Sequence, residues 1–161
     1  MRLCLRNVEK LFKFIGEILD SSKDNFLKMV IKREWIDFSN IIKDEMDNSI
    51  QQAKKANLDL RYRAFPGNTK LWGDKNKLSS VVMNLISNAI KYSSVDGIID
   101  VSLSSDQNTI IFSVVNTGLG ITSEEIEKLF KKFGRLDKHS EIEGTGLGLS
   151  ISYEIMQQHR G

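Results

Sequence analysis

The sequence predicts an α+β fold, a two-layer α/β sandwich in which helices cover one side of a sheet. Two observations lead to this prediction. Apolar residues recur at the three-and-four spacing of amphipathic helices around residues 75–92 and 147–156, and in other runs they alternate with polar residues as in strands. The chain has 161 residues, 40% of them hydrophobic, so it can bury one core. This size suits one domain with an appendage.

The first segment of the chain predicts a helix with an apolar stripe. The stripe consists of Val8, Leu11, Phe12, Ile15, Ile18 and Leu19. A free helix would expose all of these side chains, so this helix needs a partner. The partner is either a second helix or the core of the same chain.

Strands and a second helix follow. Residues 26–37 contain a strand, and a helix continues from there to about Asn57. Residues 58–63 alternate between apolar and charged side chains, which indicates a half-exposed strand. A Pro-Gly-Asn turn at residues 66–68 then leads into a strand at residues 69–72. We expect the strands of the sheet to pair in antiparallel fashion.

Residues 75–92 form a predicted helix with a narrow polar stripe, and the aspartate before them can cap its first turn. At about 100° per residue, Asn84, Asn88 and Lys91 share one side of this helix, with Tyr92 at the edge. An Asn carbonyl is a hard oxygen ligand suited to magnesium, and Lys supplies a charge for phosphate. These residues either reach into a binding cavity or form the ordinary rim of a packed helix.

A glycine-rich turn follows the last predicted strands, which lie at residues 98–103 and 109–115. The second strand is expected to be well buried, because the neighbours of its alternating apolar residues are themselves partly apolar. It runs into residues 116–121, Asn-Thr-Gly-Leu-Gly-Ile, where glycines allow a tight turn and a close approach to a ligand. A capping box at Thr122 then predicts a short helix to about Phe130. The turn could also be structural only.

A second glycine-rich segment, residues 144–149 (Gly-Thr-Gly-Leu-Gly-Leu), precedes the helical run 147–156. Free backbone N–H groups at a helix start form an anion site together with the helix dipole. A Rossmann motif does not fit, because the spacing is Gly-x-Gly-x-Gly and no hydrophobic strand precedes it. A Walker-type loop does not fit either, because no Gly-Lys-Ser/Thr follows.

In this order the three segments resemble the catalytic ATP-binding domain of sensor histidine kinases in the GHKL superfamily. Residues 84–92 match the N box, residues 116–121 the first glycine box and residues 144–149 the second. Between the glycine boxes, residues 130–135 (Phe-Lys-Lys-Phe-Gly-Arg) resemble the F box. Upstream, residues 11–23 resemble the second helix of the family's dimerisation domain. The resemblance covers nearly the whole chain.

The resemblance implies a Bergerat-type ATP-binding fold at residues 26–161, preceded at residues 1–25 by part of a dimerisation and phosphoacceptor domain. The helix that carries the acceptor histidine would precede Met1. Two further strands of the family's sheet would follow Gly161, so we expect the last strands to be missing here. The two histidines, His139 and His159, do not fit the acceptor position.

The resemblance also implies a site for ATP and Mg²⁺. Asn88 would coordinate the magnesium, Asn84 would support it, and Lys91 would contact phosphate. Arg135, with Lys131 or Lys132 as weaker candidates, would neutralise charge on the transferred phosphoryl group, because phosphoryl transfer depends largely on positioning and electrostatics. The residues implied to bind the nucleotide are Asn84, Asn88, Lys91, Tyr92, Asn116, Gly118, Gly120, Ile121, Phe133, Gly144, Thr145, Gly146, Leu147, Gly148 and Leu149.

The sequence departs from the family at Asn116. The family places Asp there, and its carboxylate accepts a hydrogen bond from the exocyclic amino group of adenine. The Asn carbonyl can still accept this bond, but the charge assistance is lost and an NH₂ group must be placed as well. Weak nucleotide binding or an altered base preference is the expected consequence.

The implied function is phosphorylation of a histidine in two-component signal transduction, in a homodimer formed through the N-terminal helix and with a response regulator as partner. One alternative is an anti-sigma-type serine kinase, which needs no attached acceptor helix. Another is a non-catalytic interaction module with a weakened nucleotide site.

Composition limits the classes of binding partner and the cellular compartment that we expect. A net charge of +2 gives no argument for nucleic acid. A single cysteine excludes a disulfide within the chain and, with two histidines, makes a structural zinc site improbable. No run of about 18 apolar residues and no signal peptide is present, so we expect a cytoplasmic location, with any membrane anchor in an upstream region.

Overall fold

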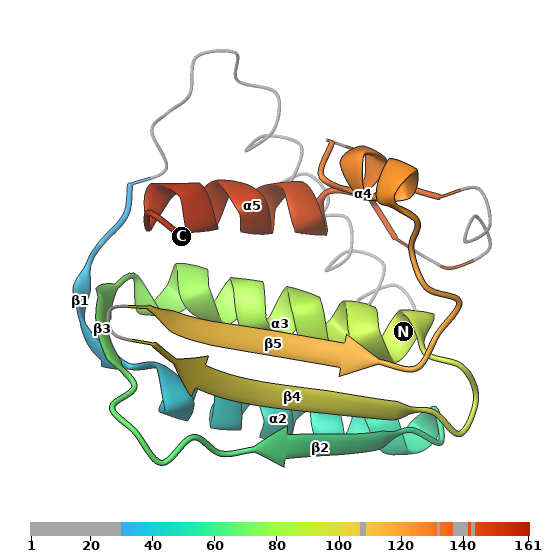
Figure 1. Cartoon of the computed structure of the whole chain (residues 1–161), viewed down its shortest axis with the longest axis horizontal. Coiled ribbons are helices and arrows are strands. Elements are labelled where there is room, and N and C mark those ends of the chain that lie inside the picture. Colours follow the sequence, from blue (N-terminus) through green and yellow to red (C-terminus); the bar gives the residue numbers. More distant parts are fainter. Residues whose placement is uncertain (1–29, 107–108, 132, 137–141, 143) are drawn as a thin grey trace, which may run out of the picture.

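The computed structural model describes residues 30–106, 109–131, 133–136, 142 and 144–161. The predicted N-terminal helix, with the proposed division at residue 25, lies outside the described residues, as do Lys132 and His139. Figure 1 shows the arrangement of the described elements.

Two sheets form the β layer. Strands β1 (Glu34–Asp37) and β3 (Lys70–Gly73) pair as an antiparallel two-stranded ribbon. Strands β2 (Asp59–Arg63), β4 (Ile98–Ser105) and β5 (Ile110–Asn116) form a second sheet in the order β2-β4-β5. The predicted strands therefore all form, with small shifts at their ends.

The expectation of purely antiparallel pairing was wrong for one pair. β4 and β5 are antiparallel, but β2 and β4 run parallel. The chain between them contains both β3 and a long helix, and a crossover of that length brings the next strand back in the same direction.

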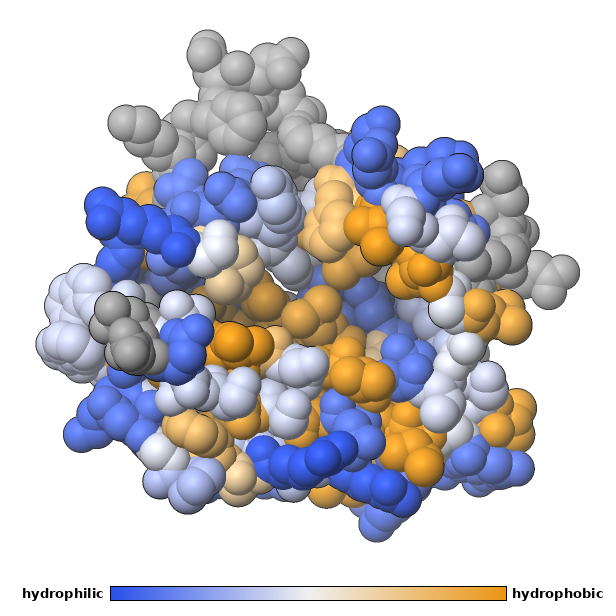
Figure 2. Space-filling view, viewed as in Figure 1, coloured by the Kyte–Doolittle hydropathy of each residue, from blue (hydrophilic) through white to orange (hydrophobic). Residues whose placement is uncertain are grey.

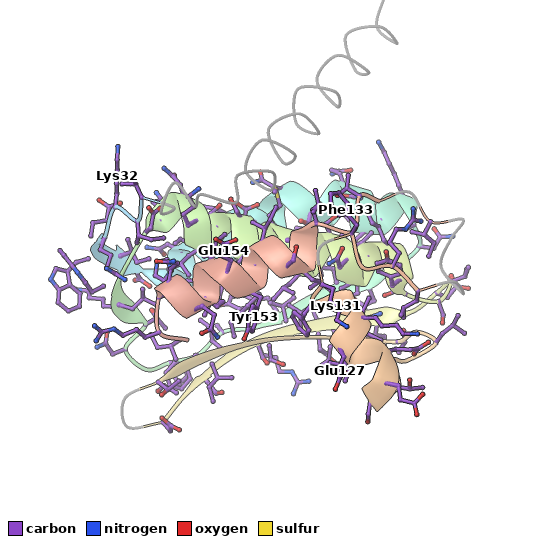
Figure 3. The ribbon with its side chains drawn as sticks, turned by 90° about the horizontal axis from the view of Figure 1, so that it is seen from above. Lys32, Glu127, Lys131, Phe133, Tyr153 and Glu154 are labelled. Carbon is purple, nitrogen blue, oxygen red and sulfur yellow. The ribbon has the colours of Figure 1, made fainter. Side chains whose placement is uncertain are left out.

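Helices α2 (Phe38–Lys55), α3 (Lys75–Tyr92) and α5 (Gly148–Gln158) lie on one side of the three-stranded sheet, as Figure 3 shows in a view from above. The short helix α4 (Ser123–Leu129) lies at the end of this sheet. The predicted α+β sandwich is confirmed. Among the described helices, none has the length and apolar character that crossing a membrane requires.

The core lies between α2, α3 and the sheet. Ile42, Val82, Ile86, Ile99 and Val101 are fully buried there, so the apolar face predicted for α3 from periodicity is the face that packs. Burying each such side chain contributes roughly 1.5–3 kcal/mol. This packing fixes the rotation of α3 and therefore the direction of its polar stripe.

The prediction that β5 is well buried was wrong. Ile110, Phe112 and Val114 pack against the core, but Ile111 and Val115 on the other face are exposed, Val115 by 63%. β5 lies at the edge of the described sheet, and the helices cover only one of its faces. Apolar residues on both faces therefore did not mean burial on both faces.

Candidate functional site

The polar stripe of α3 lies at the rim of its buried face, as predicted. Asp74 caps the helix by accepting a hydrogen bond from the backbone N–H of Lys77 at 3.0 Å. Asn84 and Asn88 are half-buried, and Lys91 at the end of the helix is exposed. A half-buried amide is held in place by its surroundings while one edge stays accessible to a ligand.

The second glycine segment meets this stripe at Asn84. Asn84 Nδ2 donates to Ser152 Oγ of α5 at 2.9 Å. A Cβ at Gly148 would overlap Asn84 Oδ1, so any larger residue there would displace the Asn84 amide. Asn84 and Gly148 are far apart in the sequence, and the packing of α3 against α5 brings them together.

The start of α5 is suited to an anion. Leu147 precedes the helix, is 1% exposed and provides no side-chain cap. The first intrahelical bond runs from Ile151 N–H to the Leu147 carbonyl at 3.0 Å, so the N–H groups of Gly148, Leu149 and Ser150 precede it. Backbone N–H groups of a first turn that has no cap attract negatively charged groups such as phosphates.

The first glycine segment meets the other end of α3. Asn116, at the end of β5, donates from Nδ2 to Ser93 Oγ at 3.2 Å. Gly118 forms an isolated bridge with Ser93, and a Cβ at Gly118 would lie 2.5 Å from the Tyr92 carbonyl oxygen. Both glycine segments therefore approach the helix that carries the N-box stripe, one at Asn84 and one at Tyr92.

The remaining residues of the first glycine segment turn outward. Gly120 has a φ of 68°, in the left-handed region that favours glycine, and Ile121 is exposed. The predicted capping box follows and is confirmed, with Thr122 and Glu125 exchanging side-chain and backbone hydrogen bonds at the start of α4.

The F-box segment packs against the second glycine segment. Phe133 has a φ of 62°, and a Cβ at Gly146 would lie 2.7 Å from the Phe133 carbonyl carbon. Arg135 donates from Nη2 to the Ile142 carbonyl at 2.7 Å. Thr145 Oγ1 accepts from Leu147 N–H at 3.4 Å. The structure thus brings Phe133 next to Gly146, while Arg135 contacts the loop between the two segments.

Apolar side chains surround this region. Ile121, Ile126, Phe130, Phe133 and Tyr153 are exposed on or near α4 and α5. The rings of Phe130 and Tyr153 lie 5.8 Å apart. Figure 2 shows apolar surface around α4 and over β5, and Figure 3 shows Lys131, Phe133 and Tyr153 where α4 approaches the start of α5.

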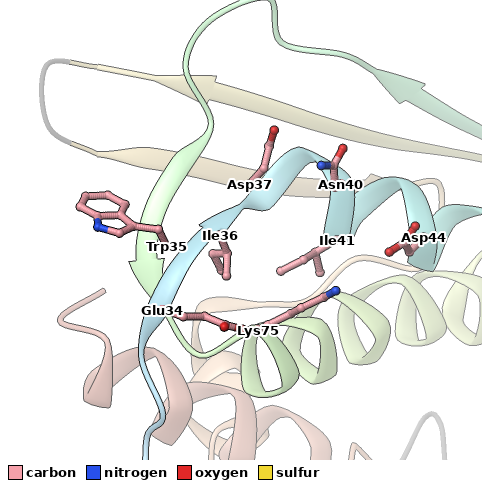
Figure 4. Close-up of a pocket in the computed structure, with 8 residues that line it drawn as sticks. All are labelled: Glu34, Trp35, Ile36, Asp37, Asn40, Ile41, Asp44 and Lys75. Carbon is pink, nitrogen blue, oxygen red and sulfur yellow. The ribbon is translucent and has the colours of Figure 1, made fainter.

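A separate open pocket of about 290 Å³ lies at the other end of the molecule (Figure 4). Its lining comes from β1, the start of α2 and Lys75, and it includes none of the predicted site residues. Asp37 borders this pocket, where hydrogen bonds from the side chains of Thr69 and Ser39 lower its pKa. Because Asp37 caps α2 with the same carboxylate, its lowered pKa has a structural explanation.

Sequence reasoning missed three residues that hold the site together: Ser93, Ser152 and His159. Ser152 is buried and lies four residues after Gly148, and two small residues at this spacing on a helix indicate close approach of another helix. His159 Nε2 accepts from the backbone N–H of Asp74 at 3.0 Å, which joins the end of α5 to the start of α3. No pattern in the sequence pointed to a role for Ser93 in the site.

Comparison with known proteins identifies the family. Residues 73–161 match the family described as histidine kinase-, DNA gyrase B-, and HSP90-like ATPase. Sensor histidine kinase RppB of Synechocystis is 34% identical over 76% of this chain and 28% of its own length. Sensor histidine kinase CpxA of Escherichia coli is 32% identical over 95% of this chain and 33% of its own length. The chain thus spans about a third or less of these relatives.

Solved structures agree with the fold. The nucleotide-free catalytic domain of histidine kinase ThkA is 25% identical, with a TM-score of 0.70 over 79% of this chain and 81% of that one. A longer ThkA structure, in complex with the response regulator TrrA, is 24% identical and has a TM-score of 0.75 over 99% of this chain and 43% of that one.

Proposed function

This chain belongs to the family of histidine kinase-, DNA gyrase B- and HSP90-like ATPases and contains a histidine kinase catalytic domain, and we propose that it binds Mg-ATP and transfers the γ-phosphoryl group to a histidine in two-component signalling. The observation that carries the proposal is the contact between Gly148 and Asn84. It brings the uncapped start of α5, whose N–H groups are suited to an anion, next to the Asn84 amide oxygen on the polar stripe of α3.

The donor set fits magnesium. Asn84 already contacts α5 through both atoms of its amide, with Nδ2 bonded to Ser152 and Oδ1 against Gly148. Asn88, one turn along and half-buried, is therefore the direct ligand in our proposal, and Asn84 supports it. Bound magnesium would neutralise phosphate charge, and Lys91 and the first turn of α5 would hold the phosphates.

Replacement of Asn88 by alanine tests the metal site. We expect Asn88→Ala to abolish magnesium-dependent ATP binding, because the ligand oxygen is lost, as measured by calorimetric titration of ATP with and without Mg²⁺. The matched control is Asn48→Ala on the exposed face of α2, which should bind as the unmodified chain does. An Asn88→Ala protein that keeps both its affinity and its magnesium dependence would exclude the assigned role.

The residue that accepts the phosphoryl group distinguishes a histidine kinase from an anti-sigma-type serine kinase. The proposed acceptor histidine belongs to a dimerisation helix outside this chain, and residues 1–25 would form part of that domain in a homodimer. A response regulator is the proposed partner, and the structurally similar kinase ThkA has been solved in complex with one, TrrA. Incubation with ATP and a polypeptide that carries the acceptor helix should give acid-labile, base-stable phosphate, as expected for phosphohistidine. Acid-stable phosphate on serine would instead support the anti-sigma-type kinase.

The third possibility, a non-catalytic interaction module, rests on Asn116. An amide in place of the family's carboxylate removes charge assistance from the proposed contact to adenine. Titration of Mg-ATP into the unmodified chain decides the point, because an interaction module with a decayed site would bind no nucleotide.

A further inference from the structure

Ser93 and Asn116 form a hydrogen bond in which the donor and the acceptor can be assigned. The Ser93 hydroxyl lies 2.6 Å from the Ala89 carbonyl oxygen, which can only accept a hydrogen bond. A serine hydroxyl has one proton, and this contact uses it. The remaining lone pairs of Ser93 Oγ can be satisfied only by a donor. The group that lies 3.2 Å away is therefore the NH₂ of Asn116 rather than its carbonyl.

The Asn116 amide is closely packed on the side that faces Ser93 and Gly118. A Cβ at Gly118 would lie 3.1 Å from Asn116 Nδ2 and 2.5 Å from the Tyr92 carbonyl oxygen, so the NH₂ group is closely packed. The bridge between Ser93 and Gly118 holds the two segments together at this point. Oδ1 is thus turned away from the helix end, and no residue in the described ranges donates a hydrogen bond to it.

We propose that Ser93 is a positioning residue that fixes the Asn116 amide with its oxygen toward the nucleotide base and thereby selects 6-amino purines over 6-oxo purines. The inference rests on the proposed function, in which Asn116 contacts the base. An unanchored amide can turn over and offer either a donor or an acceptor. An amide anchored through its NH₂ offers only an acceptor, which pairs with the amino group of adenine and repels a 6-oxo group.

The experiment compares the dissociation constants of Mg-ATP and Mg-ITP. ITP carries a 6-oxo group and lacks the 2-amino group of GTP. ATP and ITP therefore differ only at the edge of the base that Asn116 would contact. We expect Ser93→Ala to reduce the preference for ATP over ITP about tenfold, mainly through tighter binding of ITP. A preference that stays within twofold of the unmodified chain would overturn the inference.

Two further variants separate the hydroxyl from the shape of the side chain. Ser93→Thr keeps the hydroxyl and Ser93→Val has nearly the same shape as threonine without it, so we expect the first to retain the ATP preference and the second to lose it. This pair remains decisive if Ser93→Ala destabilises the end of α3. The matched control is Ser94→Ala, whose exposed side chain lies next in the sequence and should leave the preference unchanged.

A double-mutant cycle tests the mechanism itself. In the Asn116→Asp background both side-chain oxygens are acceptors, so orientation no longer matters. We expect Ser93→Ala to leave the ratio of ATP to ITP affinity unchanged in that background, and a tenfold change there would overturn the inference. If the unmodified chain binds neither nucleotide, the proposed function fails and the inference fails with it. If it binds both and Ser93 has no effect, only the inference fails.

Discussion

At residue 116 an amide stands where the family resemblance implies a carboxylate, and the structure shows how the amide is held. Its NH₂ group donates to Ser93 Oγ, and in our proposal its oxygen is the atom that accepts a hydrogen bond from the base. A neutral acceptor forms a weaker hydrogen bond than a charged one. The cost of the substitution should therefore appear in affinity rather than in the fold.

We predict that Asn116→Asp tightens ATP binding about five- to tenfold, because the carboxylate restores a charge-assisted hydrogen bond worth roughly 1 kcal/mol more. Fluorescence titration with a labelled ATP measures the change. Asn48→Asp introduces the same charge on the exposed face of α2 and controls for the net charge. An unchanged or weaker affinity in Asn116→Asp would argue against a contact with the base.

Among the elements, the pair of α3 and α5 matters most for the site. α5 approaches α3 so closely because Gly148 and Ser152 face Asn84 with little or no side-chain volume. At its other end, His159 bonds the start of α3, and Ile155 is buried between. These contacts hold α5 at both ends and in the middle. They also fix the position of the second glycine segment at its start.

We predict that Gly148→Ala lowers the free energy of unfolding by roughly 1–3 kcal/mol, because the added methyl group would overlap the Asn84 amide. Urea denaturation followed by circular dichroism measures it. Gly144→Ala adds the same methyl group where nothing lies within 4 Å, so its stability should change by less than about 0.5 kcal/mol. Equal changes in the free energy of unfolding for the two substitutions would show that overlap with Asn84 is not the cause of the effect of Gly148→Ala.

On the scale of the whole molecule, Asp74 joins three distant parts of the chain. Its carboxylate accepts from the backbone N–H of Lys32 at 2.8 Å and from that of Lys77, and its own N–H donates to His159. Nearby, Arg33 donates to the Gln158 carbonyl at 2.6 Å. The segment that enters the domain is therefore attached both to the start of α3 and to the end of α5.

This arrangement predicts a dependence of stability on pH. Burial raises the pKa of Asp74, but hydrogen bonds from the backbone N–H groups of Lys77, Lys32 and Asn76 outweigh it and hold the pKa below its ordinary value. The carboxylate therefore stabilises the fold at pH values above the unfolded-state pKa of about 3.9. This stabilisation is lost as the pH falls through the lower folded-state pKa.

We accordingly expect Asp74→Asn to lower the free energy of unfolding at neutral pH by about 1 kcal/mol, because an amide has one acceptor oxygen where both carboxylate oxygens accept, one from Lys32 N–H and one from Lys77 N–H. We also expect its stability to fall less steeply than that of the unmodified chain between about pH 5 and pH 2. Urea denaturation at a series of pH values tests both. Asp47→Asn on α2 controls for the removal of one negative charge. Parallel pH profiles for Asp74→Asn and the unmodified chain would contradict the prediction.

Much of the fold followed from local patterns. The capping aspartate and the apolar spacing of α3, and the capping box of α4, were predicted because caps and periodicity act within one or two turns. The parallel pairing of β2 with β4 and the exposure of Val115 were not predicted. Pairing and burial depend on which segments meet in space, and that is not encoded within a short stretch of sequence.

The same distinction applies to the site. The order and spacing of the polar stripe and the two glycine segments were enough to name the family and its ATP-binding domain, because residue types and backbone freedom are local properties. The anchoring of Asn116 by Ser93, the contact of Gly148 with Asn84 and the bond from Asp74 to His159 required the folded structure. These contacts join residues 23 to 85 positions apart, and only the packing of α3, α5 and β5 brings them within hydrogen-bonding or van der Waals distance.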